Sequence, residues 1–217
     1  MEQIVPAYRG KPQAEKLTYI YANTYYNLGD FYMSGYQFER FTQAYPQSDS
    51  VEVAAFKSAQ SFYNLSERYS LDQKQTYKGL EKLQEFLNKY PNSTKREEAN
   101  ILVANLRGKL EKKEFEIAKQ YYRITDYKAS IEAFDNFIQD NPGTSYREEA
   151  FLYKLKSAYE LAINSIPMLV QERLLTAKSY YNNFIKYYKD TDSAAEANKI
   201  YQDIEKRIVP SETKPNS

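Results

Sequence analysis

A cassette that recurs four times along the chain constrains its fold more than any other sequence feature. Each copy carries a phenylalanine, with a small residue seven positions before it and a bulky apolar residue three positions before it. That spacing places all three side chains on one face of an α-helix. The marker phenylalanines are Phe41, Phe86, Phe137 and Phe184.

The residue five positions after each marker predicts where the helix ends. Proline stops a helix there, because it lacks the N–H group and restricts the residue before it. The first three copies carry Pro46, Pro91 and Pro142, and the fourth carries Lys189. A hydroxyl residue follows two positions later, and nearby pairs spaced by three residues predict capping boxes for the next helices. The pairs are Asp49 with Glu52, Thr94 with Glu97, and Ser145 with Glu148.

These features predict an all-α fold, a right-handed solenoid of antiparallel helix pairs of the tetratricopeptide type. In such repeats a small residue on the second helix admits close approach of the first, and the usual unit is about 34 residues long. The units here are longer, because Pro46 and Pro91 stand 45 positions apart and Pro91 and Pro142 stand 51 apart. An offset of 96 residues also relates pairs of repeats and maps Asp30 onto Asp126.

We expect one superhelical domain over residues 1–208 and a disordered tail over 209–217, which has two prolines and no apolar pattern. Residues 1–9 resemble the last turns of a second helix whose first helix is missing. We therefore expect a truncated N-terminal repeat and a natural protein that extends further N-terminally. The helices are predicted at 13–28, 30–45, 50–68, 73–90, 95–124, 127–140, 146–165, 169–188 and 193–208, with Gly108 as a candidate bend.

Composition argues against several function classes. The formal net charge of +1 gives no field that would attract a phosphate backbone, so we expect no nucleic-acid partner. His and Cys are absent, which removes the commonest general base, the usual zinc ligands and a thiol nucleophile. We expect no enzyme activity, no catalytic residue, no metal and no cofactor. The acidic pairs Glu97-Glu98 and Glu148-Glu149 fall in first helical turns, where the helix dipole explains them.

Tyrosine is unusually frequent, with 23 residues and no tryptophan in the chain. Several tyrosines fall on the predicted first helices of the repeats, which line the concave side of such solenoids and could hold a peptide against aromatic faces. Packing in the core is the alternative for the same residues. The mixed charges between Arg107 and Lys119 likewise suit either a solvated helix face or a docking surface. The candidate peptide-binding residues are Tyr19, Tyr21, Tyr25, Tyr26, Tyr63, Tyr121 and Tyr122.

Read as a whole, residues 8–208 resemble the BamD family of outer-membrane assembly lipoproteins, in particular its tyrosine-rich Bacteroidetes versions. No apolar run in the chain approaches the roughly 18 residues of a membrane span. The longer connection with Ser-Leu-Asp-Gln, followed by this order of long and short repeats, narrows the match. The segments that carry it are Tyr8-Arg9-Gly10, Tyr25-Tyr26-Asn27-Leu28-Gly29-Asp30, Tyr69-Ser70-Leu71-Asp72-Gln73 with Thr76, Tyr90-Pro91-Asn92-Ser93, Ala118-Lys119-Gln120-Tyr121-Tyr122, and Asn141-Pro142-Gly143-Thr144 leading to Arg147-Glu148-Glu149-Ala150.

The resemblance implies five repeats and a location on the periplasmic face of the outer membrane. Attachment to the membrane would be through an N-terminal lipidated cysteine, which this chain lacks. The implied partners are the periplasmic domains of a barrel-forming assembly subunit, met by the C-terminal repeats, and unfolded outer-membrane proteins, met by the N-terminal repeats. The alternative is a tetratricopeptide scaffold of another periplasmic or cytoplasmic complex.

Overall fold

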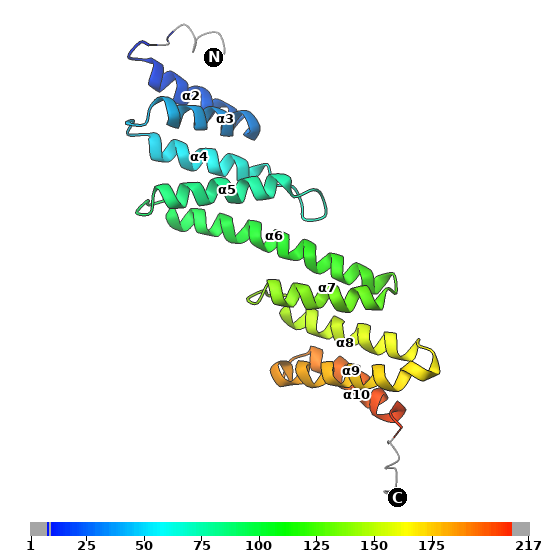
Figure 1. The fold of residues 1–217 in the computed structure, drawn as a ribbon. Helices are drawn as coiled ribbons and strands as arrows, with labels where there is room; N and C mark the ends of the chain where they lie inside the picture. Colours follow the sequence, from blue (N-terminus) through cyan, green and yellow to red (C-terminus); the bar gives the residue numbers. More distant parts are fainter. Residues whose placement is uncertain (1–7, 9, 210–217) are drawn as a thin grey trace, which may run out of the picture. The chain divides into compact units, whose positions relative to one another are not determined.

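The structure is a computed structural model that describes Tyr8 and residues 10–209. Those residues form nine α-helices and contain no β-strand, which confirms the predicted all-α class (Figure 1). The helices are α2 (Ala14–Asn27), α3 (Phe31–Ala44), α4 (Val51–Asn64), α5 (Lys74–Lys89), α6 (Arg96–Arg123), α7 (Tyr127–Asp140), α8 (Arg147–Ile163), α9 (Pro167–Tyr188) and α10 (Ser193–Arg207).

The predicted helix boundaries lie within a few residues of these. The largest difference is at α4, which ends at Asn64. α9 begins two residues earlier than predicted, at Pro167, because proline suits the first turn of a helix, where its missing N–H would have no partner. α6 runs unbroken through Gly108.

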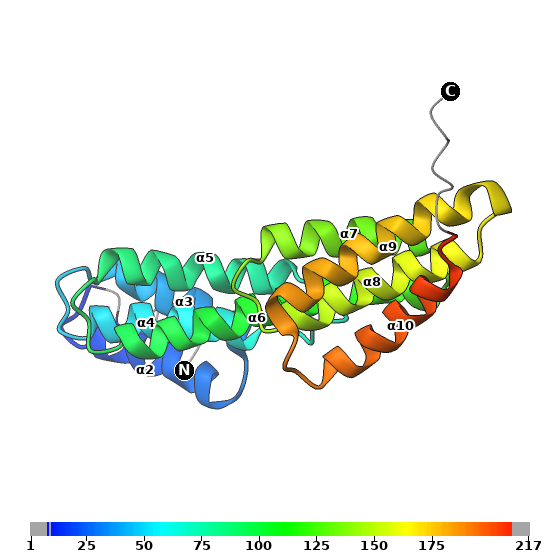
Figure 2. The ribbon, with the colours of Figure 1, turned by 90° about the horizontal axis from the view of Figure 1, so that it is seen from below.

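The chain divides into two compact units between Leu110 and Glu111, inside α6. In the first unit, α2, α3, α4 and α5 each pack against the next. In the second unit, α7 packs on α8, α8 on α9, and α10 on both α8 and α9 (Figure 2). This packing of consecutive helices is of the tetratricopeptide type. The single domain over residues 1–208 stays a prediction, and the truncated repeat and the tail fall almost entirely outside the described residues.

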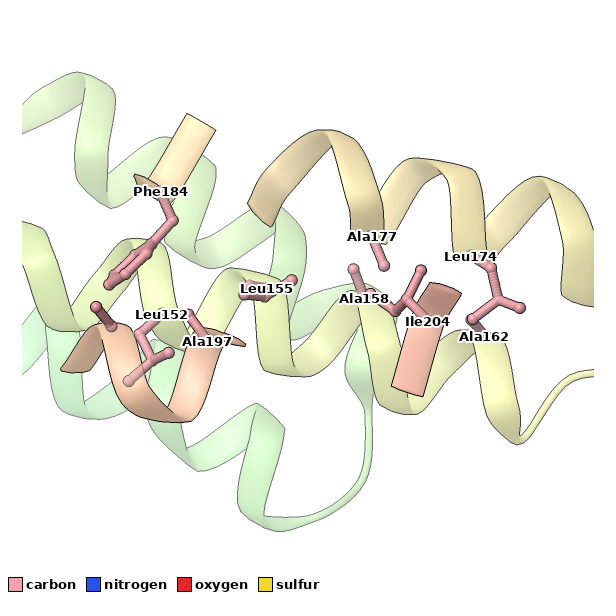
Figure 3. Close-up of a cluster of buried hydrophobic side chains, with 10 residues drawn as sticks. Leu152, Leu155, Ala158, Ala162, Leu174, Ala177, Phe184, Ala197 and Ile204 are labelled. Carbon is pink, nitrogen blue, oxygen red and sulfur yellow. The ribbon is translucent and has the colours of Figure 1, made fainter. Parts of the chain in front are cut away.

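The four marker phenylalanines lie in the cores of these units and are at most 3% exposed. In the second unit, Phe184 of α9 shares a cluster with Leu155 of α8 and Ile204 of α10 (Figure 3). The small residue of the second cassette, Gly79, is needed for close packing, because a Cβ atom there would lie 3.0 Å from Leu106 Cδ1. The cassette pattern therefore predicts which side chains pack against each other between helices.

Hydrogen bonds explain why the cassettes end as they do. The backbone N–H groups of Tyr45, Tyr90 and Asn141 each donate to the carbonyl of the marker phenylalanine four residues earlier, and proline follows directly. Proline disfavours helical geometry in the residue before it, so the helix stops there. The fourth copy has no proline, and α9 continues one residue further, through Tyr188.

The predicted capping boxes are wrong at α4 and α8. These helices have Ser50 and Tyr146 as capping residues, one position later than predicted, and neither side chain caps the helix. The hydroxyl that follows the proline binds the residue before the helix: Ser48 Oγ accepts from the Ser50 N–H at 3.1 Å, and Thr144 Oγ1 accepts from the Tyr146 N–H at 3.2 Å. Glu52 accepts a hydrogen bond from the Ser93 hydroxyl of the next turn. The hydroxyls therefore shape the turns between repeats.

The long connection between α4 and α5 is held from within. The Gln73 side-chain amide donates to the carbonyls of Arg68, Tyr69 and Leu71, and its oxygen accepts from Thr76 Oγ1 at 2.7 Å. Both Gln73 and Thr76 are buried. One amide therefore binds three backbone carbonyls of a loop without regular structure.

Candidate functional site

The seven candidate tyrosines come from α2, α4 and the second half of α6, and the structure separates them into packed and surface groups. Tyr19 belongs to the packed group. Its ring meets Phe38 and Phe41 edge to face, with centroids 5.6 and 5.5 Å apart. Burial raises the pKa of its hydroxyl. The main role of Tyr19 is therefore to complete the core between α2 and α3.

Tyr26 is also largely structural. Its ring packs edge to face on Phe31 at 5.6 Å, and the ammonium of Lys57 lies 4.9 Å from the ring centroid. Lys57 Nζ also donates to the Asn23 side chain. Burial raises the pKa of Tyr26 and lowers the pKa of Lys57. The two residues therefore join α2 to α4 through a cation–π contact.

Tyr63 and Tyr122 pack in the same way on their own neighbours. Tyr63 lies against the core cluster that contains Phe86 and Leu106. Tyr122 packs edge to face on Tyr153 of α8, with ring centroids 5.3 Å apart, and burial raises its pKa. These two tyrosines have little free ring face for a ligand.

Tyr21 and Tyr25 form a half-buried pair on α2. Their rings meet edge to face at 5.0 Å and their hydroxyls lie 3.0 Å apart. One turn further on, Leu28 is 75% exposed. Because these residues stand at positions i, i+4 and i+7, they form one continuous row on the helix. We call Tyr21, Tyr25 and Leu28 the first stripe.

A second row stands at the equivalent place in the second unit. The offset of 96 residues maps the first stripe onto Ile117, Tyr121 and Ile124. These side chains are 48%, 37% and 57% exposed. We call them the second stripe. The tyrosines of both stripes are among the binding residues predicted from the sequence, whereas Leu28, Ile117 and Ile124 are not, although the spacing i, i+4, i+7 within the 96-residue repeat identifies them.

The charges near the second stripe are paired within the unit. Lys119 Nζ lies 2.9 Å from a carboxylate oxygen of Glu149, and Lys156 Nζ lies 2.7 Å from one of Glu196. Both ammonium groups also lie 4.8 Å from the centroid of the Tyr153 ring. Burial alone would lower the pKa of Lys156, but the hydrogen bond and the charge of Glu196, together with the charges of Tyr122 and Tyr153, outweigh it and the pKa is raised. These lysines stay charged and bind α8 to its neighbours.

Comparison with known proteins places this arrangement in a family. Residues 1–174, most of the chain, match the family model YfiO, described as outer membrane lipoprotein. The chain belongs to the YfiO family. The predicted relation to BamD proteins is thereby confirmed.

Two curated relatives agree with the YfiO assignment. The chain is 27% identical over 121 residues to the outer membrane protein assembly factor BamD of Caulobacter vibrioides. The aligned region covers 56% of this chain and 39% of the relative. It is 25% identical over 119 residues to the outer membrane protein assembly factor BamD of Rickettsia prowazekii. This aligned region covers 55% of this chain and 47% of the relative. The chain therefore spans less than half the length of the curated relatives it matches.

Two further findings bear on the chemistry open to this YfiO-family chain. Among residues 8 and 10–209, no helix has the length and apolar character needed to cross a membrane. In the same part of the chain, no cluster of three or more His, Cys, Asp or Glu side chains could hold a metal ion.

Proposed function

We propose that this protein is a non-catalytic subunit of the machinery that assembles β-barrel proteins in the outer membrane, acting at the periplasmic face. It binds unfolded outer-membrane proteins and the barrel-forming subunit. Membership of a family described as outer membrane lipoproteins supports the location. The relatives' description as outer membrane protein assembly factors supports the process.

The observation that carries the substrate-binding role is that the two stripes repeat at the same offset as the core. Buried positions such as Phe38 and Phe134 recur at the 96-residue offset because packing requires them. Packing does not require that Leu28 and Ile124, which are exposed, recur as large apolar residues. A shared ligand chemistry explains this recurrence, since exposed apolar side chains in a row favour binding of an apolar segment.

The spacing of the stripes suits an extended chain. Residues four apart on a helix are separated by about 6 Å along its axis. Alternate side chains on one face of an extended strand are separated by about 6.6 Å. An unfolded barrel strand, apolar at alternate positions, can therefore place successive side chains against Ile117 and Tyr121, or against Tyr21 and Tyr25.

The corner between α8 and α9 supports the second binding role. Ile166 and Met168 are 60% and 84% exposed there, and Leu175, about two turns further along α9, is 56% exposed. Methionine adapts its shape to a partner surface at low cost. We assign this corner to the periplasmic domain of the barrel-forming subunit, so that the two partners occupy different surfaces.

The test of substrate binding measures fluorescence anisotropy of a labelled peptide with the sequence of a C-terminal barrel strand. The variant Ile117→Ser/Tyr121→Ser should bind it at least about tenfold more weakly, since two apolar contacts are lost. Tyr77→Ser, which removes an exposed tyrosine on α5, is the matched control and should bind normally. Equal affinities of the stripe variant and the control would rule out the stripe as the site.

The test of the partner uses the native protein isolated from detergent-solubilised envelopes. Co-purification with the barrel-forming subunit, lost in Met168→Glu, is the expected result. Recovery without any barrel-assembly subunit would contradict the proposal and favour a tetratricopeptide scaffold of another complex.

A further inference from the structure

A groove in the first unit lies outside the stripes and is not used by the proposed function. It has a volume of about 440 Å³ and runs between α5 and α6. Leu87, which is buried, and Val103 contribute its apolar side chains. Arg96 and Arg107 of α6 lie along the same groove.

The groove is positively charged without compensation. None of its lining residues is acidic; besides the two arginines, the polar ones are the amides Gln84, Asn88 and Asn100. Among the described residues, the arginine ion pairs are formed by Arg123 and Arg207, and neither lies in this groove. Arg96 Nη1 donates to the Pro91 carbonyl at 3.0 Å, which leaves most of its five N–H donors available. The groove therefore complements carboxylates.

The second unit shows what kind of segment fits such a groove. Arg147 of α8 corresponds to Arg96, because each donates to the carbonyl of the cassette proline before it. Counting from this pair, Phe151 and Ala158 of α8 correspond to Asn100 and Arg107 of α6.

In α8 this face is covered by α9. Phe151 packs on Tyr188 of α9 with ring centroids 5.9 Å apart, and Ala158 is buried in the cluster that contains Leu174 of α9. The first unit has a polar amide and a guanidinium at the same positions, and no described helix of that unit covers them. The groove therefore lies at the position on α6 that α9 occupies on α8, and its polar side chains suit a partner with polar groups.

The two guanidinium groups set the spacing of that partner. Arg96 and Arg107 stand 11 residues apart, which is three helical turns or about 16 Å along the axis. Carboxylates at positions i and i+11 of a helix lie on one face at the same separation. Apolar residues at i+4 and i+7 of that helix face Leu87 and Val103.

We propose that the groove between α5 and α6 binds an amphipathic helix of a partner protein, with carboxylates three turns apart paired to Arg96 and Arg107. This inference rests on the geometry of the first unit and is independent of the substrate and of the barrel-forming subunit. Charge-assisted pairs with arginine supply the specificity, and Leu87 and Val103 supply the apolar contact.

The experiment uses the full chain and a fluorescently labelled, alanine-based helical peptide of 18 residues with capped ends. Glutamate stands at its positions 4 and 15 and leucine at 8 and 11. The control peptide has glutamine in place of both glutamates. We expect at least about tenfold tighter binding of the glutamate peptide, and a loss of about tenfold in Arg107→Gln. Arg68→Gln, an exposed arginine of the same unit, is the matched control and should bind as the unchanged protein does.

Three results of this binding experiment would overturn the proposal. Equal affinity for the two peptides, or undetectable binding of the glutamate peptide, overturns the proposal. Preference for the glutamate peptide that survives Arg107→Gln also overturns it, because binding then lies elsewhere. Circular dichroism of Arg107→Gln should match the unchanged protein, since this side chain is exposed. Failure of the stripe variants to affect strand-peptide binding would leave this result untouched.

Discussion

The Oγ atoms of Ser34 and Ser61 lie 3.0 Å apart in the core of the first unit, joining α3 to α4. Ser130 and Ser157 repeat this contact at 2.8 Å in the second unit, between α7 and α8. All four side chains are fully buried. Small hydroxyl residues thus permit close helix approach and satisfy each other at the contact.

Ser61→Ala should destabilise the protein by about 1–2 kcal/mol, because the Ser34 hydroxyl loses its partner in a buried site. The double variant Ser34→Ala/Ser61→Ala should cost less than the sum of the two single variants, since the second change removes the unpaired group. Urea denaturation of the four proteins measures this. Strictly additive costs would show that the two hydroxyls do not stabilise each other.

Substitutions in the turns after α2 and α6 test whether the 96-residue repeat extends to the backbone conformation. Gly29 and Thr125 occupy equivalent positions, with φ of 78° and 62°. A β-branched residue is strained at positive φ, whereas glycine is not. Thr125→Gly should therefore stabilise the protein by up to about 1 kcal/mol, and Gly29→Thr should destabilise it by about 1–2 kcal/mol. Thermal denaturation gives both signs, and a loss of stability in Thr125→Gly would contradict the assignment of strain.

Replacing two helical glycines by alanine should change the stability of the protein in opposite directions. At Gly108 an added Cβ meets nothing within 4 Å, so Gly108→Ala should stabilise the protein by about 0.5–1 kcal/mol through helix propensity. At Gly79 the same atom would lie 3.0 Å from Leu106 Cδ1 and 3.2 Å from the Phe62 carbonyl oxygen. Gly79→Ala should destabilise by about 1–3 kcal/mol, because overpacking outweighs propensity. Urea midpoints of the two variants that move in the same direction would contradict this packing argument.

Alkaline pH should weaken the contact between α8 and α10. Tyr159 Oη donates to the Asp203 carboxylate, and burial together with this bond raises the pKa of Tyr159 to about 12. Unfolded tyrosine has a pKa of about 10. The folded state therefore holds the proton more tightly, and this stabilisation is complete below about pH 10 and lost as the pH rises towards about 12.

Tyr159→Phe removes this dependence. Its free energy of unfolding, measured by urea denaturation at several pH values from 8 to 11, should fall less steeply than that of the unchanged protein. Tyr77→Phe, at an exposed site on α5, should keep the original slope. Identical slopes for all three proteins would mean that Tyr159 does not couple folding to pH.

Local chemistry explains why some features could be predicted from the sequence. The positions of Phe41, Phe86, Phe137 and Phe184 in the cores follow from helical periodicity, and three helix ends follow from the effect of proline on the residue before it. Capping could not be predicted as well. α4 begins one residue later than predicted, so Asp49 is not its capping residue, and the Ser48 hydroxyl accepts from the Ser50 N–H in the turn before the helix. Such small shifts depend on how the turn packs.

The sequence by itself determined the class of the fold, its repeat and its relation to the YfiO family, because these depend on periodic residue types. Only the tertiary structure decided which tyrosines are available to a ligand. Tyr19 and Tyr121 both lie on first helices, yet Tyr19 is covered by Phe38 and Phe41 while Tyr121 is exposed. The physical reason is that spacing along a helix defines a face, whereas the neighbouring helices determine whether that face meets protein or solvent.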